Sequence, residues 1–566
     1  MALTTLFDTV ASTCSEISLS KALYYLTAGA LLYEAAWIFY CRFFHPYSSI
    51  PGPLLASFSR LWIALSVASG RAEHIQRELH QKHGPFVRIA PNEISIADPS
   101  AVKTIYNVKS GFTKTDFYPP FATNISPNGD HFAQVDETKH AERRKYVNNV
   151  YSMSSVLESE TYIESCIDVF LGKIDKFASL GVDIDLGEWI QWYTFDVVGE
   201  LFFGHQFGFM RDEHDFGGYI ESLDALLPGT ALSLVLPSYI RPLHMAISML
   251  FPTTRKSVKG FEEVRVAGRY WTNTRQQQME SGMVGRVDFL DKFFKIKDNK
   301  DGWDIPDIQN EACVAILAGS DTTAIAIRSI LYHLMKNTKC MDKLLAEIDD
   351  FDARGLLSKP HVKYTEAIKM PYLVACCKEG MRLHPSVGLG MPRHVPPAGA
   401  TISGRFFKPG SRVSVNAAVI HYDKSIFGED AACFNPDRWL YGDVGMMDRH
   451  MLHFGGGSRT CIGKNKNRRI KASIRSLQRQ SRLFRRIDGD IFTLPTSYLM
   501  TALYTADLKA ATHLTWLLII ATDLHDNTGN ASCCGTLGFR PRLGVGFRVY
   551  SNMSQQGIFS AERIAT

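Results

Sequence analysis

The segment FGGGSRTCIG, residues 454–463, restricts the local fold more than any other part of this sequence. It places four glycines and one arginine around a single cysteine, Cys461. Glycine adopts backbone conformations and approach distances that are closed to residues with a Cβ atom, so N–H groups can point at one sulfur and a flat molecule can lie close. A thiolate in such a turn is suited to act as a metal ligand, because N–H donors and a nearby cation favour its charged form.

Other roles for Cys461 have less support in the surrounding residues. A lone cysteine is usually a small buried hydrophobe, a role that does not require neighbouring glycines. A nucleophilic cysteine needs a base, and no paired His and Asn arrangement stands beside it. A zinc site needs further Cys or His ligands at short spacing, and Ile462 to Lys466 contains none.

A single membrane anchor is predicted near the N-terminus. After an N-terminal segment of residues 1–21, residues 22–41 read ALYYLTAGALLYEAAWIFYC, with Glu34 as the one charged residue. About 20 apolar residues cross the hydrocarbon core as a helix, and aromatic residues near both ends suit the interface. A cleaved signal peptide and a buried core helix are the alternatives. Residues 42–53, which end in PGP, form a stiff hinge to the domain that follows.

One domain over residues 54–463 is the simplest interpretation, because no low-complexity linker or solenoid repeat interrupts it. Apolar residues at three- and four-residue spacing predict that most of it is helical, whereas FVRIA and EISIA within 86–96 predict a hairpin-like pair of strands. The predicted fold class is therefore mainly α with small β-sheets. The predicted helices are 72–83, 137–150, 155–178, 187–203, 255–281, 305–336, 339–350 and 365–383.

Polar residues interrupt the apolar helix predicted over 305–336. The run AGSDTT, residues 318–323, places Asp321 and two threonines where burial of polar groups is unfavourable unless hydrogen bonds compensate. The hydroxyl groups can bond to carbonyl groups of their own helix, which would make the run a local kink. Alternatively, the helix opens locally over a cofactor and offers a hydroxyl and a carboxylate for proton delivery.

Two further motifs carry paired charges. KEGMRLHP places Glu379 and Arg382 three residues apart on one helix face, and FNPDRW supplies Arg438 as a second cation for the same carboxylate. A solvated surface ion pair is the ordinary explanation of such spacing. Neither motif identifies a function by itself.

The charge and the cysteines exclude two classes of protein. The net charge is +5, but residues 464–486 hold ten Lys and Arg and no acid, so without them 52 cations face 57 acids. Such a local excess argues against a general nucleic-acid-binding surface, and aromatics for base stacking are nearly absent there. The 11 cysteines are irregularly spaced, unlike a secreted disulfide framework, and are interpreted as cytosolic thiols.

The order AGSDTT, EGMR, FNPDRW and FGGGSRTCIG resembles the cytochrome P450 family, the haem-thiolate monooxygenases, over roughly residues 50–463. GPFVRIAPNEISIADP, HAERRKYV, MPRHVPP and HYDKSIFGEDAACFNPDRW resemble microsomal members from filamentous fungi, near the pisatin-demethylase-like group of secondary metabolism. The family fold that this implies is mostly helical with small sheets. Four separate motifs in the family order make the resemblance specific.

The resemblance also implies a role for each site residue. Cys461 is the axial thiolate ligand of the iron in haem b, and this ligand favours O–O cleavage. Asp321 and Thr322 position water and relay protons, while Gly319 leaves room for oxygen and substrate. The implied structural triad, which supports the haem-binding core, is Glu379, Arg382 and Arg438. The other implied haem contacts, mainly to the propionates, are Arg459, Arg393, Arg144, His140 and Phe454.

The implied reaction inserts one oxygen atom from O2 into a small lipophilic metabolite, with electrons from NADPH. The implied partner is NADPH-cytochrome P450 reductase, with cytochrome b5 as an optional second donor, and no nucleic acid. The implied location is the endoplasmic reticulum membrane, single-pass, with the catalytic domain in the cytosol. Residues 115–126, Ala315 and the SVGLG segment at 386–390 are the pocket candidates.

The sequence departs from the family pattern after CIGK, where the family has an apolar-faced helix under the haem. Residues 464–566 instead begin with the basic run, which cannot form a buried face. Either the tail is a real divergence that offers a basic surface to an acidic partner, or it reflects an altered reading of the gene. Two other functions therefore stay open: a haem-thiolate isomerase or dehydratase, and a catalytically impaired homologue.

Overall fold

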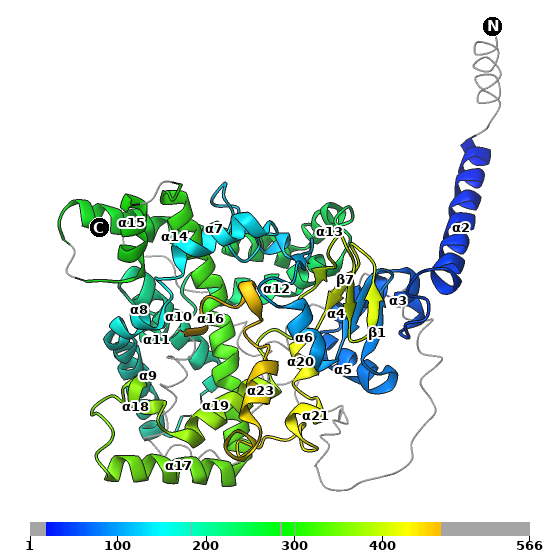
Figure 1. Cartoon of the computed structure of the whole chain (residues 1–566). Coiled ribbons are helices and arrows are strands. Elements are labelled where there is room, and N and C mark those ends of the chain that lie inside the picture. The colour runs from blue at the N-terminus through cyan, green and yellow to red at the C-terminus, as the bar shows by residue number, and fades with distance from the viewer. Residues whose placement is uncertain (1–18, 183, 284–285, 300–301, 466–566) are drawn as a thin grey trace. The chain divides into compact units, whose positions relative to one another are not determined.

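The computed structural model describes residues 19–465, except 183, 284–285 and 300–301, and Figure 1 shows how its elements are arranged. The predicted basic tail over 464–566 lies outside this range apart from its first two residues. The helices are α2 (Leu19–Phe43), α3 (Leu54–Phe58), α4 (Leu61–Ala68), α5 (Ala72–His83), α6 (Pro99–Ile105), η1 (Pro119–Phe121), α7 (Glu137–Val147), α8 (Met153–Glu158), α9 (Glu160–Leu180), α10 (Leu186–Phe203), α11 (Phe209–Asp212), η2 (Phe216–Gly218), α12 (Tyr219–Val235), α13 (Arg241–Ser248), α14 (Pro252–Glu280), α15 (Phe289–Asn299), α16 (Ile305–Lys336), α17 (Thr338–Ala353), α18 (Tyr364–Ala367), α19 (Pro371–Leu383), α20 (Ala417–Ile420), α21 (Lys424–Phe427), α22 (Arg438–Tyr441), α23 (Val444–His450) and η3 (Gly457–Arg459). The strands are β1 (Phe86–Ala90), β2 (Glu93–Ile96), β3 (Thr113–Lys114), β4 (Arg393–His394), β5 (Ala400–Ile402), β6 (Arg405–Phe407) and β7 (Arg412–Ser414).

The prediction of a mainly helical chain with small sheets is confirmed, and helices 72–83 and 305–336 have the predicted bounds. The predicted helix 365–383 is divided into α18 and α19, because Pro371 starts a new helix. Proline is favoured in the first turn, where a backbone N–H has no acceptor within the helix, so the N–H that proline lacks is not needed there. The predicted helix 155–178 is likewise divided into α8 and α9 near Ser159. The sequence patterns missed α12, which contains Pro228 in its interior.

The five-stranded sheet has the order β1-β2-β7-β4-β3, and β5 and β6 form a separate pair. β1 and β2 are the predicted hairpin, and β2 continues the sheet by pairing in parallel with β7. β4 pairs with β7 and β3 in antiparallel fashion. The sheet thereby joins segments of the chain that are about 300 residues apart, roughly 90–114 with 393–414.

Helix α2 has the properties of a membrane-spanning helix. Residues 20–43 have a mean hydropathy of 1.2, and none of the most apolar window is buried. The alternative that this segment is a buried core helix is therefore wrong. The hinge that follows packs on β1, because Arg88 N–H donates to the carbonyl of Pro51 at 2.8 Å. A Cβ atom on Gly52 would lie 2.3 Å from the Arg88 carbonyl oxygen, so only glycine fits there.

Helix α16 passes the same length and hydropathy test but lies in the core, with 56% of its most apolar window buried. It packs against α10, α14, α15, α17 and α19 (Figure 1). Its start is fixed by a capping box between Asp304 and Asp307 and by proline in the first turn. The helix carries the AGSDTT run into the centre of the main hydrophobic cluster.

A buried group of ion pairs joins α19 to the first residues of α22. Arg382 Nε and Nη2 donate to the two carboxylate oxygens of Glu379 at 2.9 and 2.7 Å. Arg438 Nε and Trp439 Nε1 donate to the same carboxylate at 3.0 and 2.8 Å. Burial alone would raise the pKa of Glu379, but the hydrogen bond and charge of Arg382, with the charge of Arg438, hold it below its ordinary value. Glu379 is therefore a buried anion between two cations.

The same pair positions the chain that leads to the cysteine segment. Arg382 Nη1 donates to the carbonyls of His421 and Ala431 at 2.7 and 2.6 Å. Burial lowers the pKa of His421 to about 3, so its ring is neutral. His421 Nδ1 donates to the Arg382 carbonyl, and its Nε2 accepts from Leu452 N–H at 2.9 Å. The Leu452 carbonyl then accepts from Gly455 N–H at 2.7 Å.

We expect Glu379→Gln to lower the free energy of unfolding by about 3–5 kcal/mol, because it leaves the buried guanidinium of Arg382 without its anion and that of Arg438 with Asp430 alone. Chemical denaturation of the full chain, followed by tryptophan fluorescence, measures the change. Glu429→Gln is the matched control, since Glu429 forms an exposed pair with Lys424 and its loss should leave the transition in place. Equal stability of the two variants would contradict a structural role for the buried pair.

Candidate functional site

The cysteine segment is a glycine turn packed against the C-terminal end of α6. Cys461 N–H donates to the carbonyl of Phe454 at 2.8 Å and closes the turn. Gly457 has a φ of 62°, and a Cβ atom there would lie 2.2 Å from the carbonyl oxygen of Tyr106. A Cβ on Gly456 would lie 3.0 Å from the Tyr106 side chain. These two glycines are therefore required by backbone packing, a reason that the sequence alone did not give.

Cys461 differs from the other cysteines of the described part of the chain. It is exposed, whereas Cys41, Cys166, Cys313 and Cys376 are buried and Cys340, Cys377 and Cys433 are half-buried. Burial raises the pKa of the buried thiols, to about 12 for Cys313. A thiol with access to a ligand and a cation nearby is the one suited to act as a thiolate, and the guanidinium of Arg144 interacts electrostatically with Cys461.

Two buried cations face each other where β3 pairs with β4. Lys114 lies directly opposite Arg393 in the register, and each residue is 6% exposed. Like charges at such positions repel. Burial and the charges of Arg393 and Arg459 lower the pKa of Lys114 well below its ordinary value. Its ammonium group donates to the carbonyl of Phe132 but pairs with no carboxylate of the described residues.

Helix α7 places His140, which is 2% exposed, beside these cations. Burial and the charges of Arg459 and Lys114 lower the pKa of His140 to about 3, and its Nε2 atom has no hydrogen-bond partner within the described residues. Arg459 is held by a two-point contact with Glu137, at 3.2 and 2.8 Å. We call Lys114, Arg144, Arg393 and Arg459, together with the neutral ring of His140 among them, the cationic cluster. The sequence predicted all of these residues except Lys114.

The cationic cluster and the exposed thiol fit a haem. A haem carries two propionate carboxylates, and these would neutralise the repulsion between Lys114 and Arg393 and accept a hydrogen bond from His140. The thiol of Cys461 would supply an axial ligand to the iron. Phe454, whose ring centroid lies 4.2 Å from that of His453, belongs to the same turn.

The AGSDTT run does not open α16. The helix is continuous, and the hydroxyls of Thr322 and Thr323 donate to the carbonyls four residues earlier at 2.8 and 2.7 Å. The expected local opening is thus not observed, because these side chains satisfy themselves within the helix. Ala318 is nevertheless exposed and Gly319 half-buried, between buried Ile316 and Ser320. This face of small residues leaves space beside the helix.

Burial raises the pKa of Asp321, and the positive charge of Arg328 opposes that rise. Gln191 Nε2 on α10 donates to Asp321 Oδ1 at 3.5 Å. Helix α16 also receives a bond from the SVGLG segment, in which Ser386 donates to the carbonyl of Thr322 at 2.8 Å. The helix residues Asp321 and Thr322 are therefore fixed by contacts from two other parts of the chain.

The predicted pocket segment 115–126 is held on the first turns of α16. Ser126 Oγ donates to Asp307 at 2.5 Å, Thr123 bonds to Asn310, and His131 pairs with Glu311 at 3.0 Å. These three acceptors lie at i, i+3 and i+4 on one helix face. The sequence patterns did not indicate this contact, since its partners are about 180 residues apart.

One apolar residue of the same segment, Phe117, lines a small cavity. Phe117 meets Leu389 and Gly390 of the SVGLG segment there, together with Val235 of α12. Further lining residues are Ile63, Gln76, Ile89, Glu93 and Ser414. The two predicted pocket segments thus meet, and the cavity between them is mostly apolar.

Comparison with known proteins agrees with this site. The family described as Cytochrome P450 matches residues 51–465. The cytochrome P450 monooxygenase gsfF of Penicillium aethiopicum is 40% identical over 453 residues, which cover 78% of this chain and 89% of that protein. A pisatin demethylase of Fusarium vanettenii is 33% identical over 435 residues, or 76% and 84%. The monooxygenase ACRTS1 of Alternaria alternata is 36% identical over 325 residues, or 57% and 86%.

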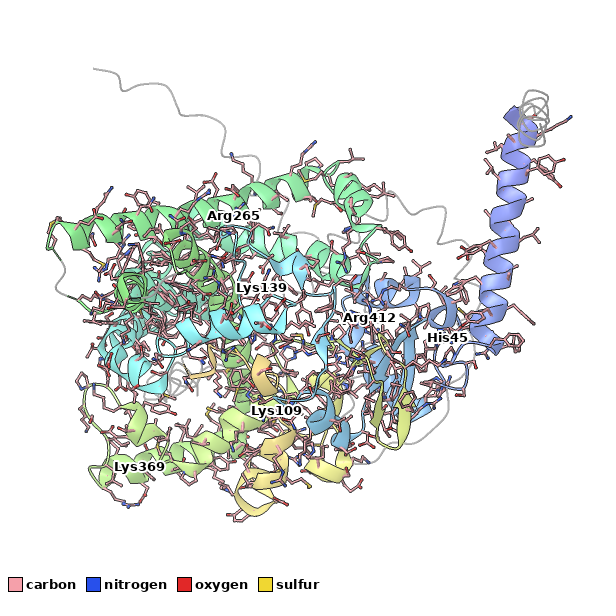
Figure 2. All side chains as sticks on the ribbon, turned by 45° about the horizontal axis from the view of Figure 1, so that its top comes forward. His45, Lys109, Lys139, Arg265, Lys369 and Arg412 are labelled. Carbon is pink, nitrogen blue, oxygen red and sulfur yellow. The ribbon has the colours of Figure 1, made fainter. Side chains whose placement is uncertain are left out.

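We expect Lys114→Met to weaken haem retention about tenfold or more, because a charge-assisted hydrogen bond contributes roughly 1.5–3 kcal/mol. The same change should leave the haem-free protein as stable or more stable, since it removes an unpaired buried cation. Haem transfer to apomyoglobin and thermal unfolding of the haem-free chain measure the two effects. Lys109→Met, at an exposed lysine labelled in Figure 2, is the control. Loss of stability without faster haem transfer would contradict the assignment.

Proposed function

Since this chain belongs to the cytochrome P450 family and is a fungal oxidoreductase of the monooxygenase type, we propose that it hydroxylates or similarly oxidises a lipophilic metabolite of secondary metabolism. The observation that carries the proposal is the exposed Cys461 turn beside Lys114 and Arg393, two buried cations that form no ion pair with a carboxylate of the described residues. Bound haem supplies the oxygen-activating chemistry of this family. The residues of the chain bind the haem, position the substrate and move protons.

In this proposal Cys461 is the iron ligand, and Lys114, His140 and Arg393 bind the propionates. Arg459 contributes indirectly, because its two-point contact with Glu137 connects the cysteine turn to α7. Glu379, Arg382 and Arg438 have no direct part in the reaction. They hold the chain that positions the turn, through the bonds of His421 to Leu452.

Asp321 and Thr322 are proposed to deliver protons. The side chain of Asp321 is half-buried with one cation, Arg328, near it, and burial raises the pKa of its carboxyl above the ordinary value, which favours the protonated form. Thr322 Oγ1 donates to its own helix but its oxygen still accepts. The exposed Ala318 and the half-buried Gly319 leave room beside both residues.

The substrate is proposed to be apolar, and its binding surface to include Phe117 and Leu389. Phe117, Tyr118, Phe121 and Phe132 form consecutive ring contacts with centroids 5.2–6.4 Å apart. Such a set buries a ring or alkyl substrate without requiring charged contacts. The relatives named as monooxygenases favour this reaction over an isomerase or dehydratase, which needs no dioxygen.

Electrons are proposed to come from NADPH through a membrane-bound reductase that docks on α7. Lys139 and Lys145 are exposed on this helix, which also carries His140 and Arg144 of the cationic cluster (Figure 2). A basic surface one helix away from the haem site suits an acidic electron donor.

The anchor is proposed to hold the domain on the cytosolic face of the endoplasmic reticulum. Besides α2, helix α13 exposes Leu243, Met245 and Ile247 by 61%, 50% and 49%. Helix α4, which packs on α12 and follows α3 in the chain, exposes Leu61 and Leu65. Exposed apolar patches on several neighbouring elements are suited to lie in the interface of a bilayer.

The first test is the carbon-monoxide difference spectrum of the reduced full-length chain. We expect a strongly red-shifted Soret band that disappears in Cys461→Ala and persists in Cys433→Ala. Cys433 is half-buried and contributes its main-chain carbonyl, at 3.1 Å, to Arg382. Absence of the band from folded, haem-supplied wild-type protein would instead support a catalytically impaired homologue, since the family match ends at residue 465, where the basic tail begins.

Lys139→Glu should slow reduction of the haem by the reductase about tenfold, and the loss should shrink at high salt. Stopped-flow reduction under carbon monoxide measures the rate. Lys369→Glu reverses an equally exposed lysine on the connection between α18 and α19 (Figure 2). The same slowing in both variants would show a general charge effect and contradict docking on α7.

A further inference from the structure

The small cavity between the two pocket segments also contains polar side chains that have no part in the proposed reaction. Gln76 of α5 and Glu93 of β2 line it although they are only 3% and 4% exposed, and buried Ser414 of β7 lines it as well. Polar groups buried this deeply are normally hydrogen-bonded, because an unmade bond in apolar surroundings is unfavourable. The bonds that these groups already form show which of their bonding positions are left for a ligand.

The orientation of the Gln76 amide is fixed through Asn416. Asn416 Oδ1 accepts from the N–H of Ala418 at 2.9 Å, at the start of α20, so its Nδ2 group is the donor on the other side. That group donates to Gln76 Oε1 at 2.9 Å and to the carbonyl of Gly388 at 2.8 Å. The Nε2 group of Gln76 is thus left at the other end of the amide, and it has no acceptor among the residues that the structure describes. Gln76 therefore offers a donor to the cavity that it lines.

Glu93 supplies the complementary group, an acceptor. Arg60, just before α4, donates from Nη1 to Glu93 Oε2 at 2.7 Å and from Nε to the carbonyl of Val235 at 2.7 Å. The other oxygen of the carboxylate, Oε1, receives no hydrogen bond within the described part of the chain. Because the ion pair with Arg60 compensates the charge of Glu93, the free oxygen can accept from a neutral donor.

These two free positions select among the polar groups that a lipophilic molecule can carry. A carboxylate would accept from Gln76 but would be repelled by Glu93, and an ether or ketone would leave the Glu93 oxygen without a donor. An ammonium group would leave the Gln76 N–H without an acceptor. A hydroxyl group both donates and accepts, so it satisfies both side chains and stays neutral in a mostly apolar cavity.

We propose that this cavity binds a hydroxyl group of the lipophilic substrate, with Gln76 as the hydrogen-bond donor to it and Glu93 as the acceptor from it. The inference rests on the proposed function, since it names the polar group of the molecule that is oxidised. Asn416 and Arg60 are positioning residues, because they hold the two side chains but do not line the cavity.

A purely structural role explains Asn416 and Arg60 but not the free positions beside them. The bonds of Arg60 join β2 to the end of α12, and those of Asn416 join α5 to the SVGLG segment. Neither set uses Gln76 Nε2 or Glu93 Oε1. An amide and a carboxylate that are buried with unused bonding positions on one cavity are explained by a ligand that fills those positions.

The SVGLG segment determines which end of the substrate reacts. Its first residue, Ser386, bonds to the Thr322 carbonyl on α16, and its last two residues, Leu389 and Gly390, line the cavity. A chain that advances four residues spans at most about 14 Å. In the proposed function oxidation takes place beside α16, so the carbon that reacts lies on the end of the substrate remote from the hydroxyl group.

The first experiment is equilibrium dialysis of the haem-loaded full chain in nanodiscs with two probes, 4-phenylphenol and biphenyl, which differ by one hydroxyl group. Empty nanodiscs correct for partition into the lipid. The factor by which 4-phenylphenol binds more tightly than biphenyl measures the contribution of the hydroxyl group, and no turnover is needed. We expect Gln76→Met to reduce this factor about fivefold or more, because the hydroxyl oxygen loses its donor while biphenyl has no bond to lose.

Gln81→Met is the matched control, since Gln81 is an exposed residue of the same helix and the substitution is the same. An unchanged factor in Gln76→Met, or an equal fall in both variants, would overturn the inference. If Gln76→Met does not fold, the wild type decides with 4-fluorobiphenyl, whose fluorine is close to a hydroxyl group in size but cannot donate to Glu93. We expect this probe to bind about tenfold more weakly than 4-phenylphenol, and equal binding of the two would overturn the inference.

Product analysis with NADPH and reductase tests the direction of binding. We expect wild-type protein to oxidise 4-phenylphenol on the ring remote from the hydroxyl group, and Gln76→Met to shift oxidation toward the hydroxyl-bearing ring. Oxidation of mainly the hydroxyl-bearing ring by the wild type would contradict this direction. The two levels fail separately: dialysis without a preference for the hydroxyl group overturns the inference even where products form. A preference for the hydroxyl group without a carbon-monoxide band supports the cavity assignment and overturns the proposed function.

Discussion

The buried contact of Glu379 with Arg382 and Arg438 is the constraint on which the rest of the site depends. An isolated carboxylate or guanidinium at zero exposure would be strongly unfavourable, so these groups persist only where each fills the other's hydrogen-bonding positions. The remaining guanidinium N–H groups of Arg382 bond to the carbonyls of His421, Ala431 and Cys433, which lie outside the helices and strands. These bonds fix the backbone of a segment that has little regular secondary structure, and the Cys461 turn lies at the far end of that segment.

The turn and the cationic cluster are formed by segments that the sheet and α7 bring together. β3 and β4 set Lys114 against Arg393, and Arg459 reaches α7 through Glu137. These two contacts therefore join parts of the chain that are far apart in sequence. The main hydrophobic cluster around α10 and α16 stabilises the folded domain. The domain can therefore tolerate the local repulsion between the cations of the site.

Residue patterns predicted the long elements well and the site only in part. The bounds of helices α5 and α16 could be predicted from their apolar periodicity and from the residues at their ends. The break before α19 could also have been predicted, because Pro371 marks the start of a helix. Cys461 and the Glu379 triad came from motif order, since a spacing of three residues cannot distinguish a surface pair from a buried one. Lys114 was missed because an ordinary lysine acquires its unusual pKa only from burial and like-charged neighbours, which no local sequence pattern contains.

The two buried clusters show opposite departures from charge balance. Around Lys114 the excess is positive and burial lowers the pKa of a base; around Asp321 the excess is negative and burial raises the pKa of an acid. In both, the group at the centre is pushed toward its neutral form. Carboxylates that bind beside Lys114 would neutralise the positive excess, so this cluster favours a ligand with carboxylate groups that stays bound. The negative excess is relieved when a proton binds, which is consistent with the proposed role of Asp321 in proton delivery.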